Sequence, residues 1–91
     1  MKIIKRNGNT TIYDDQKIIR SILKANESSG ELIRLTEKEA ANLAFHAMSR
    51  LTEDSEVIST KEIRDSVYAE LCARELNETA KAYMDYKKTN G

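Results

Sequence analysis

The 91-residue sequence has few of the residues that interrupt or cross-link a chain: no proline, three glycines and one cysteine. Without proline, long helices can run uninterrupted. A single cysteine excludes an intrachain disulfide and a Cys-x-x-Cys zinc site. We therefore expect a reducing, cytoplasmic compartment and a single, mostly helical domain over residues 1–91.

Long apolar runs and an excess of one charge are absent as well. No apolar stretch approaches the roughly 18 residues that a membrane span needs, and residues 1–8 (MKIIKRNG) lack the apolar core of a signal peptide. Fifteen basic and fifteen acidic side chains cancel, so the chain lacks the strong positive field typical of nucleic-acid-binding proteins. We predict no membrane contact and no direct nucleic-acid binding.

The charges are unevenly distributed along the chain. Over residues 1–24, six basic side chains against two acidic ones give +4, whereas over residues 25–56 three basic against seven acidic ones give −4. The last 35 residues are balanced. One end of the molecule should therefore attract anions.

An Asn-Gly dipeptide at residues 7–8 separates two short β-forming segments, residues 3–6 and 10–13. Asn-Gly favours a type I′ turn, because both central residues of that turn need a positive φ. A two-residue loop of this kind would place Ile4 opposite Thr11. We predict an N-terminal β-hairpin that packs on helices, since an isolated hairpin is only marginally stable in water.

Four helices are predicted after the hairpin from apolar residues at helical spacing. Their predicted N-caps are Asp14 or Asp15, Thr36 with Glu39, Ser59 with Glu62, and Asn77. The predicted inward-facing residues are Ile18, Ile19, Ile22, Leu23, Ala40, Leu43, Ala44, Ala47, Met48, Leu51, Ile63, Val67, Leu71, Cys72, Ala80, Tyr83, Met84 and Tyr86. The predicted order is ββαααα, and the fold class is α+β, mostly helical, with an N-terminal β-hairpin packed on a four-helix bundle.

Four short segments, in this order, carry a resemblance to a known family: residues 5–8 (KRNG), 15–18 (DQKI), 59–63 (STKEI) and 80–87 (AKAYMDYK). Together they resemble the ATP-cone, the N-terminal regulatory domain of ribonucleotide reductases and of a repressor of reductase genes. The resemblance implies a hairpin-plus-four-helix domain that binds ATP or dATP beneath the hairpin and regulates its host allosterically. It also implies reductase catalytic or partner subunits as binding partners, and a possible homo-oligomer.

The resemblance further implies which residues line the nucleotide site. Cations from the hairpin tip, a helix start and the last helix would surround the phosphates, and the backbone of residues 3–5 would lie beside the adenine. The expected nucleotide-binding residues are Ile3, Ile4, Lys5, Arg6, Lys17, Ile18, Thr60 and Lys87. We expect ATP or dATP to bind with Mg²⁺, and we expect no resident metal and no catalytic residue.

Three positions depart from the family pattern. Asn7 replaces an Asp, which suits a turn equally well. Thr11 stands where some members carry an acid near the nucleotide. Lys87 replaces an Arg. The positive charge is kept, but the planar guanidinium group that can donate two hydrogen bonds to a phosphate is lost, which predicts a weaker phosphate contact.

Other interpretations of the same residues stay open at this point. On composition alone, Lys5 and Arg6 could protect an edge hairpin from pairing with another chain. The alternative function is a helical interaction or assembly module, or a relative of the repressor, that binds no nucleotide. A DNA-binding repressor is disfavoured because the four-cysteine zinc ribbon is missing.

Three further residue types have ordinary structural interpretations. Carboxylates at Glu62, Asp65 and Glu70 could serve catalysis, but no nucleophile and base accompany them, and alternating charges usually form a solvated helix face. His46 is predicted at the surface and Cys72 as a packed thiol.

Overall fold

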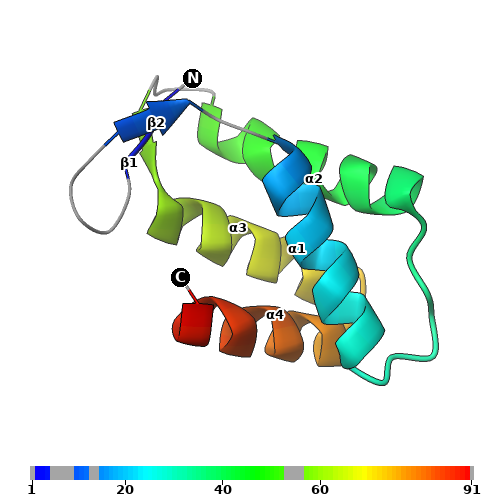
Figure 1. Ribbon diagram of the computed structural model, residues 1–91. Helices are drawn as coiled ribbons and strands as arrows, with labels where there is room; N and C mark the ends of the chain where they lie inside the picture. The colour runs from blue at the N-terminus through cyan, green and yellow to red at the C-terminus, as the bar shows by residue number, and fades with distance from the viewer. Residues whose placement is uncertain (1, 5–9, 13–14, 53–56, 91) are drawn as a thin grey trace.

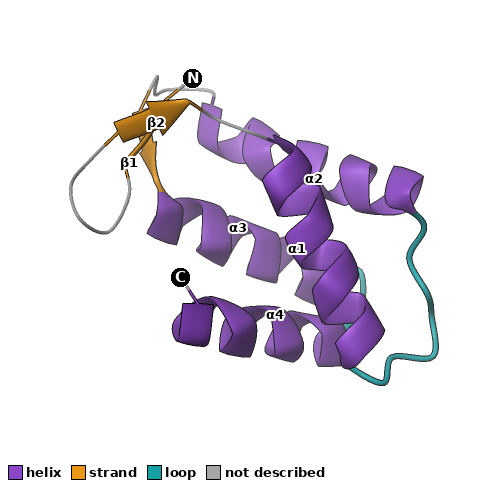
Figure 2. Ribbon diagram, in the orientation of Figure 1, coloured by secondary structure: helices purple, strands orange, loops and turns teal. Residues whose placement is uncertain are grey.

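The computed structural model describes residues 2–4, 10–12, 15–52 and 57–90. Over these ranges the element order is β1 (Lys2–Ile4), β2 (Thr10–Ile12), α1 (Asp15–Ser28), α2 (Glu37–Thr52), β3 (Val57–Ser59), α3 (Thr60–Ala73) and α4 (Asn77–Asn90) (Figure 1). The helices form the bulk of the molecule, and the short strands lie together at one end of it (Figure 2). The prediction of a mostly helical chain with four helices is confirmed.

The three strands form one small sheet in the order β2-β1-β3. β1 pairs with β2 antiparallel, with Ile4 opposite Thr10. The predicted pairing of Ile4 with Thr11 is therefore wrong by one residue. Five residues separate Ile4 from Thr10 in the sequence, and an odd number does not fit a regular two-residue turn. The turn predicted at Asn7-Gly8 lies outside the described residues.

β3 was not predicted, and the order ββαααα is corrected to ββααβαα. It pairs with β1 in parallel, with Ile3 opposite Ile58 and Ile4 opposite Ser59. The buried Ile58 joins the core. A three-residue strand is too short to show a periodic pattern, and this one depends on a partner more than 50 residues away in the sequence.

The core lies between the four helices, and most of the predicted inward-facing residues are confirmed. α2 packs against α3, α1 against α4 and α2, and α3 against α4. The buried apolar residues are Ile18, Ile19, Ile22, Ala25, Ala40, Leu43, Ala44, Ala47, Met48, Ile58, Ile63, Val67, Leu71, Leu76, Ala80 and Tyr83. Leu23, Leu51, Cys72 and Met84 are partly buried against them.

The predicted caps of α2 and α3 are present. At α2 the Glu39 N–H donates to Thr36 Oγ1 at 3.1 Å, and the Thr36 N–H donates to Glu39 Oε1 at 3.0 Å. These bonds favour the ionised carboxylate and lower the pKa of Glu39. At α3 the Glu62 N–H donates to Ser59 Oγ at 3.1 Å. Two side-chain caps thus fix where these helices begin.

The predicted cap of α4 needs correction. The Ala80 N–H donates to the Leu76 carbonyl at 2.9 Å, so Leu76 occupies the N-cap position and Asn77 is the first helical residue. Leu76 has no side-chain oxygen to accept a hydrogen bond from the first turn of α4. Glu31, from the loop between α1 and α2, supplies that acceptor, as described below. The predicted cap of α1 at Asp14 lies outside the described residues, and α1 begins at Asp15.

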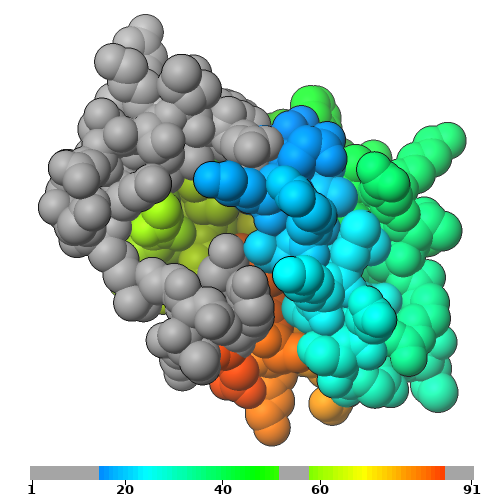
Figure 3. Space-filling view, viewed as in Figure 1, coloured from blue at the N-terminus to red at the C-terminus, as the bar shows by residue number. Residues whose placement is uncertain are grey.

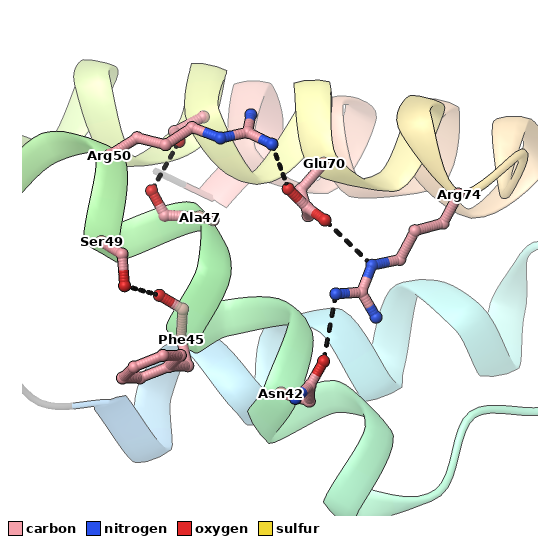
Figure 4. A network of polar contacts seen from close by, with 8 residues as sticks. Asn42, Phe45, Ala47, Ser49, Arg50, Glu70 and Arg74 are labelled. Carbon is pink, nitrogen blue, oxygen red and sulfur yellow. Dashed lines mark hydrogen bonds and ion pairs between the residues drawn. The ribbon is translucent and has the colours of Figure 1, made fainter.

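A polar network ties α2 to α3 beside the core (Figure 4). Glu70 is buried, and its two carboxylate oxygens accept from Arg50 Nη2 at 2.5 Å and Arg74 Nε at 3.0 Å. Arg74 Nη2 also donates to Asn42 Oδ1 at 3.1 Å. Because both oxygens are paired, the buried charge of Glu70 is compensated.

Candidate functional site

A hollow opens at the end of the molecule where α3 begins (Figure 3). The first residues of α3 form its floor, and the first residues of α1 project over one edge. α3 and α4 run side by side in opposite directions, so the start of α3 and the end of α4 lie at the same end of the molecule, next to the sheet (Figure 1). Three helix ends and a sheet therefore approach the same space.

The parallel pairing of β1 with β3 brings the first predicted site residues together. Ile4 lies opposite Ser59, and Thr60 follows as the first residue of α3. The strand pairing therefore places Ile3 and Ile4 of β1 next to the start of α3, where Thr60 is exposed. The same arrangement places the positive end of the α3 dipole at the hollow.

Lys17 and Ile18 lie in the first turn of α1, and the start of this helix borders the hollow (Figure 3). The Ile18 side chain is buried in the core, whereas Lys17 is exposed. Ile18 thus anchors the first turn of α1 and fixes the point from which Lys17 extends.

Lys87 lies near the end of α4, four residues after the buried Tyr83. The end of α4 lies at the same end of the molecule as the start of α3 (Figure 1). Lys5 and Arg6 lie outside the described residues. The described part of the chain therefore brings Ile3, Ile4, Lys17, Thr60 and Lys87 to one end of the molecule.

Arg64 is a candidate that the sequence reasoning missed. It lies one turn after Thr60 on α3, and within the described part of the chain its buried Nε has no hydrogen-bond acceptor. The nearest carboxylate oxygen, Oδ1 of Asp65, is 3.7 Å from Nε, beyond hydrogen-bond distance. A buried N–H of a cation without an acceptor is unfavourable, which makes Arg64 a candidate partner for an anionic ligand near the start of α3. The signal available in the sequence was a basic residue four positions after Thr60.

The charge of Arg64 also influences a buried neighbour. Burial raises the pKa of the Tyr83 hydroxyl, and the positive charge of Arg64 opposes part of that rise. Arg64 on α3 therefore acts electrostatically on Tyr83 of α4, across the contact between the two helices.

Comparison with known proteins gives one decisive match. A family model described as the ATP cone domain matches residues 1–91, the whole sequence. The chain belongs to the ATP-cone family. ATP-cone domains are nucleotide-binding allosteric regulatory domains that bind ATP or dATP, and they are not catalytic. A comparison with curated proteins gave no match.

Two of the three carboxylates that the sequence offered for catalysis form ion pairs in this ATP-cone. Glu70 pairs with two arginines, and Asp65 Oδ2 accepts from Lys61 Nζ at 3.0 Å. The bond from Lys61 lowers the pKa of Asp65. These contacts stabilise helices and their packing.

The remaining side chains singled out in the sequence have structural places in the ATP-cone. His46 is exposed on α2 and contacts the Phe45 ring edge-on at 5.8 Å between centroids. Cys72 is partly buried against the core, and its hydrogen bond with Tyr68 raises the pKa of that hydroxyl. None of the described helices combines the length and apolar character needed to cross a membrane.

Proposed function

We propose that this ATP-cone binds ATP or dATP, with Mg²⁺, in the hollow between β1, the first turns of α1 and α3, and the last turn of α4. One observation carries the proposal: among the described residues, the buried Nε of Arg64 in the second turn of α3 has no acceptor. The first residues of the same helix floor the hollow (Figure 3). A triphosphate supplies the oxygens that such a group needs.

The roles follow from the chemistry of each position. Lys5, Arg6, Lys17, Lys87 and Arg64 neutralise the phosphates, and Thr60 donates its hydroxyl to a phosphate oxygen at the start of α3. The β1 backbone at Ile3 and Ile4, together with Lys5, provides donors and acceptors for the edge of the adenine. Ile18 supports the site from the core.

The regulatory output is a change in assembly of the host. We assign the chain as an allosteric regulatory domain of a ribonucleotide reductase, or a free-standing relative in the cytoplasm, with reductase subunits or a second copy as partners. The family match supports a nucleotide-responsive domain, and the resemblance of the four sequence segments supports this host.

Isothermal titration calorimetry with ATP, dATP, GTP and AMP, each with Mg²⁺, tests the proposal. We expect binding of ATP and dATP, weaker binding of GTP because its base edge differs, and the weakest binding of AMP because two phosphates are missing. A ligand present at about 100 times its dissociation constant should also stabilise the fold by roughly 2.7 kcal/mol. Flat traces at millimolar ATP, with an unchanged melting temperature, would show that the chain does not bind this ligand.

A further inference from the structure

The N-terminus of α4 is capped by a carboxylate from a distant part of the chain. Glu31 lies in the loop of residues 29–36 between α1 and α2, and its Oε1 accepts from the Thr79 N–H at 3.1 Å and from Thr79 Oγ1 at 3.2 Å. Thr79 is the third residue of α4. Since Leu76 at the N-cap position has no side-chain acceptor, Glu31 supplies both the acceptor and the favourable negative charge at this helix end.

The loop that carries Glu31 is held by polar contacts to α1. The buried Asn26 donates from Nδ2 to the Ile33 carbonyl at 2.9 Å and to Thr79 Oγ1 at 3.1 Å. Its Oδ1 accepts from the Leu35 N–H at 2.9 Å. Three bonds from one side chain thus connect the loop, α1 and α4.

Hydrophobic burial contributes little at the middle of this loop. Leu32 and Ile33 are 97% and 59% exposed. Leu35 near the end of the loop packs partly against the core, so directional hydrogen bonds hold the middle of the loop in position.

The two ends of α4 lie in different surroundings. Its 14 residues span about 21 Å at 1.5 Å per residue. Thr79 at one end contacts the loop, and Lys87 lies near the other end, at the proposed nucleotide site. A helix transmits a shift along its axis as a rigid body, so binding at one end alters the contacts at the other.

We propose that Glu31 is a positioning residue for α4, and that its carboxylate couples nucleotide binding at the C-terminal end of α4 to docking of the 29–36 loop at the N-terminal end. This inference rests on the proposed nucleotide site. ATP favours the docked loop, and by linkage the docked loop favours ATP.

Amide hydrogen exchange of the full chain, with and without MgATP, tests the coupling. We expect ATP to slow exchange at Leu35 and Thr79, whose amides make the loop contacts, about fivefold or more, in addition to slowing it around Thr60. Glu31→Ala should abolish the ATP-dependent slowing at Leu35 and weaken ATP binding by about fivefold. Glu31→Gln keeps an oxygen acceptor and should fall between the wild type and Glu31→Ala.

Glu78→Ala is the matched control, because Glu78 is an exposed carboxylate in the first turn of α4 that carries the same charge. It should bind ATP like the wild type and retain the slowing at Leu35. Slowing around Thr60 with no change at Leu35 and Thr79, or wild-type ATP affinity in Glu31→Ala, would overturn the coupling while leaving the nucleotide site intact. No ATP-dependent change anywhere in the chain would overturn the nucleotide site and the coupling together.

Discussion

Arg64 and Lys17 are the described side chains on which the proposed site depends most. The Lys17 side chain is exposed, and that of Arg64 is only 21% exposed. The two lie on different helices whose first turns border the same hollow (Figure 3). Phosphate contacts from both would join α1 to α3 through the ligand.

We predict that Arg64→Gln and Lys17→Ala each weaken ATP binding about tenfold or more. Loss of a hydrogen bond to a charged group costs roughly 1.5–3 kcal/mol. Arg64→Lys should restore part of the affinity, because it keeps the charge without the Nε–H. Calorimetry measures the affinities, and Arg20→Ala, an exposed cation one turn later on α1, is the control.

Wild-type affinity in either variant would remove that residue from the site. Equal losses in Arg20→Ala and Lys17→Ala would mean that α1 contributes only a diffuse positive field.

Tyr83 predicts how stability responds to alkaline pH. Burial raises the pKa of this hydroxyl in the folded state, so the contribution of Tyr83 is fully present below the ordinary tyrosine pKa of about 10. Above that pH the unfolded chain loses the proton first, and the free energy of unfolding falls by up to about 1.4 kcal/mol per pH unit. Urea denaturation from pH 8 to about pH 11 should show this fall.

Tyr83→Phe removes the ionisable group and should flatten that part of the profile relative to the wild type. The difference between the two profiles isolates the contribution of Tyr83 from those of the other ionisable groups. Parallel profiles would mean that Tyr83 ionises freely in the folded protein.

At the level of elements, the helices could be predicted from the sequence because their signals are local. Apolar spacing placed the core face of α1, and two capping boxes placed the starts of α2 and α3. β3 and the Glu31 cap could not be predicted, because each depends on a partner about 50 residues away. The register of β1 and β2 was mispredicted because a two-residue loop was assumed.

The corner between α3 and α4 shows a second feature that sequence patterns did not reveal. The Leu76 N–H donates to the Leu71 carbonyl at 2.9 Å, and the Glu75 N–H to the Cys72 carbonyl at 3.0 Å. This is a Schellman motif, which places residue 75 in the left-handed region at a φ of 62°. Glycine is the usual residue there, and here it is a glutamate.

We predict that Glu75→Gly stabilises the fold by about 1 kcal/mol, the approximate cost of a left-handed backbone for an L-residue with a side chain. Urea denaturation measures the effect. Glu78→Gly, in the regular helix that follows, should instead destabilise the fold by roughly 0.5–1 kcal/mol. A loss of stability in Glu75→Gly would show that the Glu75 side chain makes a contact worth more than the strain.

At the scale of the whole molecule, the separation of charge suggests how a bound nucleotide changes assembly. Residues 1–24 carry +4 and residues 25–56 carry −4. Phosphates bound at the basic end would cancel its field, and so remove repulsion between two basic ends or attraction to an acidic segment of a neighbour.

We predict that the mass of the isolated chain in solution depends on nucleotide and on salt. Light scattering with no ligand, with ATP and with dATP, at low and high salt, measures it. Any nucleotide-dependent change should fade at high salt, because exposed charges are screened beyond about 8–10 Å at physiological ionic strength. A constant monomer mass under every condition would show that assembly requires a host subunit.

The position of the nucleotide is the central claim, and it can be mapped directly. Binding of ATP with paramagnetic Mn²⁺ in place of Mg²⁺ broadens the amide resonances nearest the phosphates in a ¹⁵N spectrum. We predict broadening at Lys17, Thr60, Arg64 and Lys87, with sharp resonances at the far end of α1. Broadening centred instead on the shallow depression lined by Lys24, Ala25, Glu27 and Ser28, or no selective broadening at all, would contradict the proposed site.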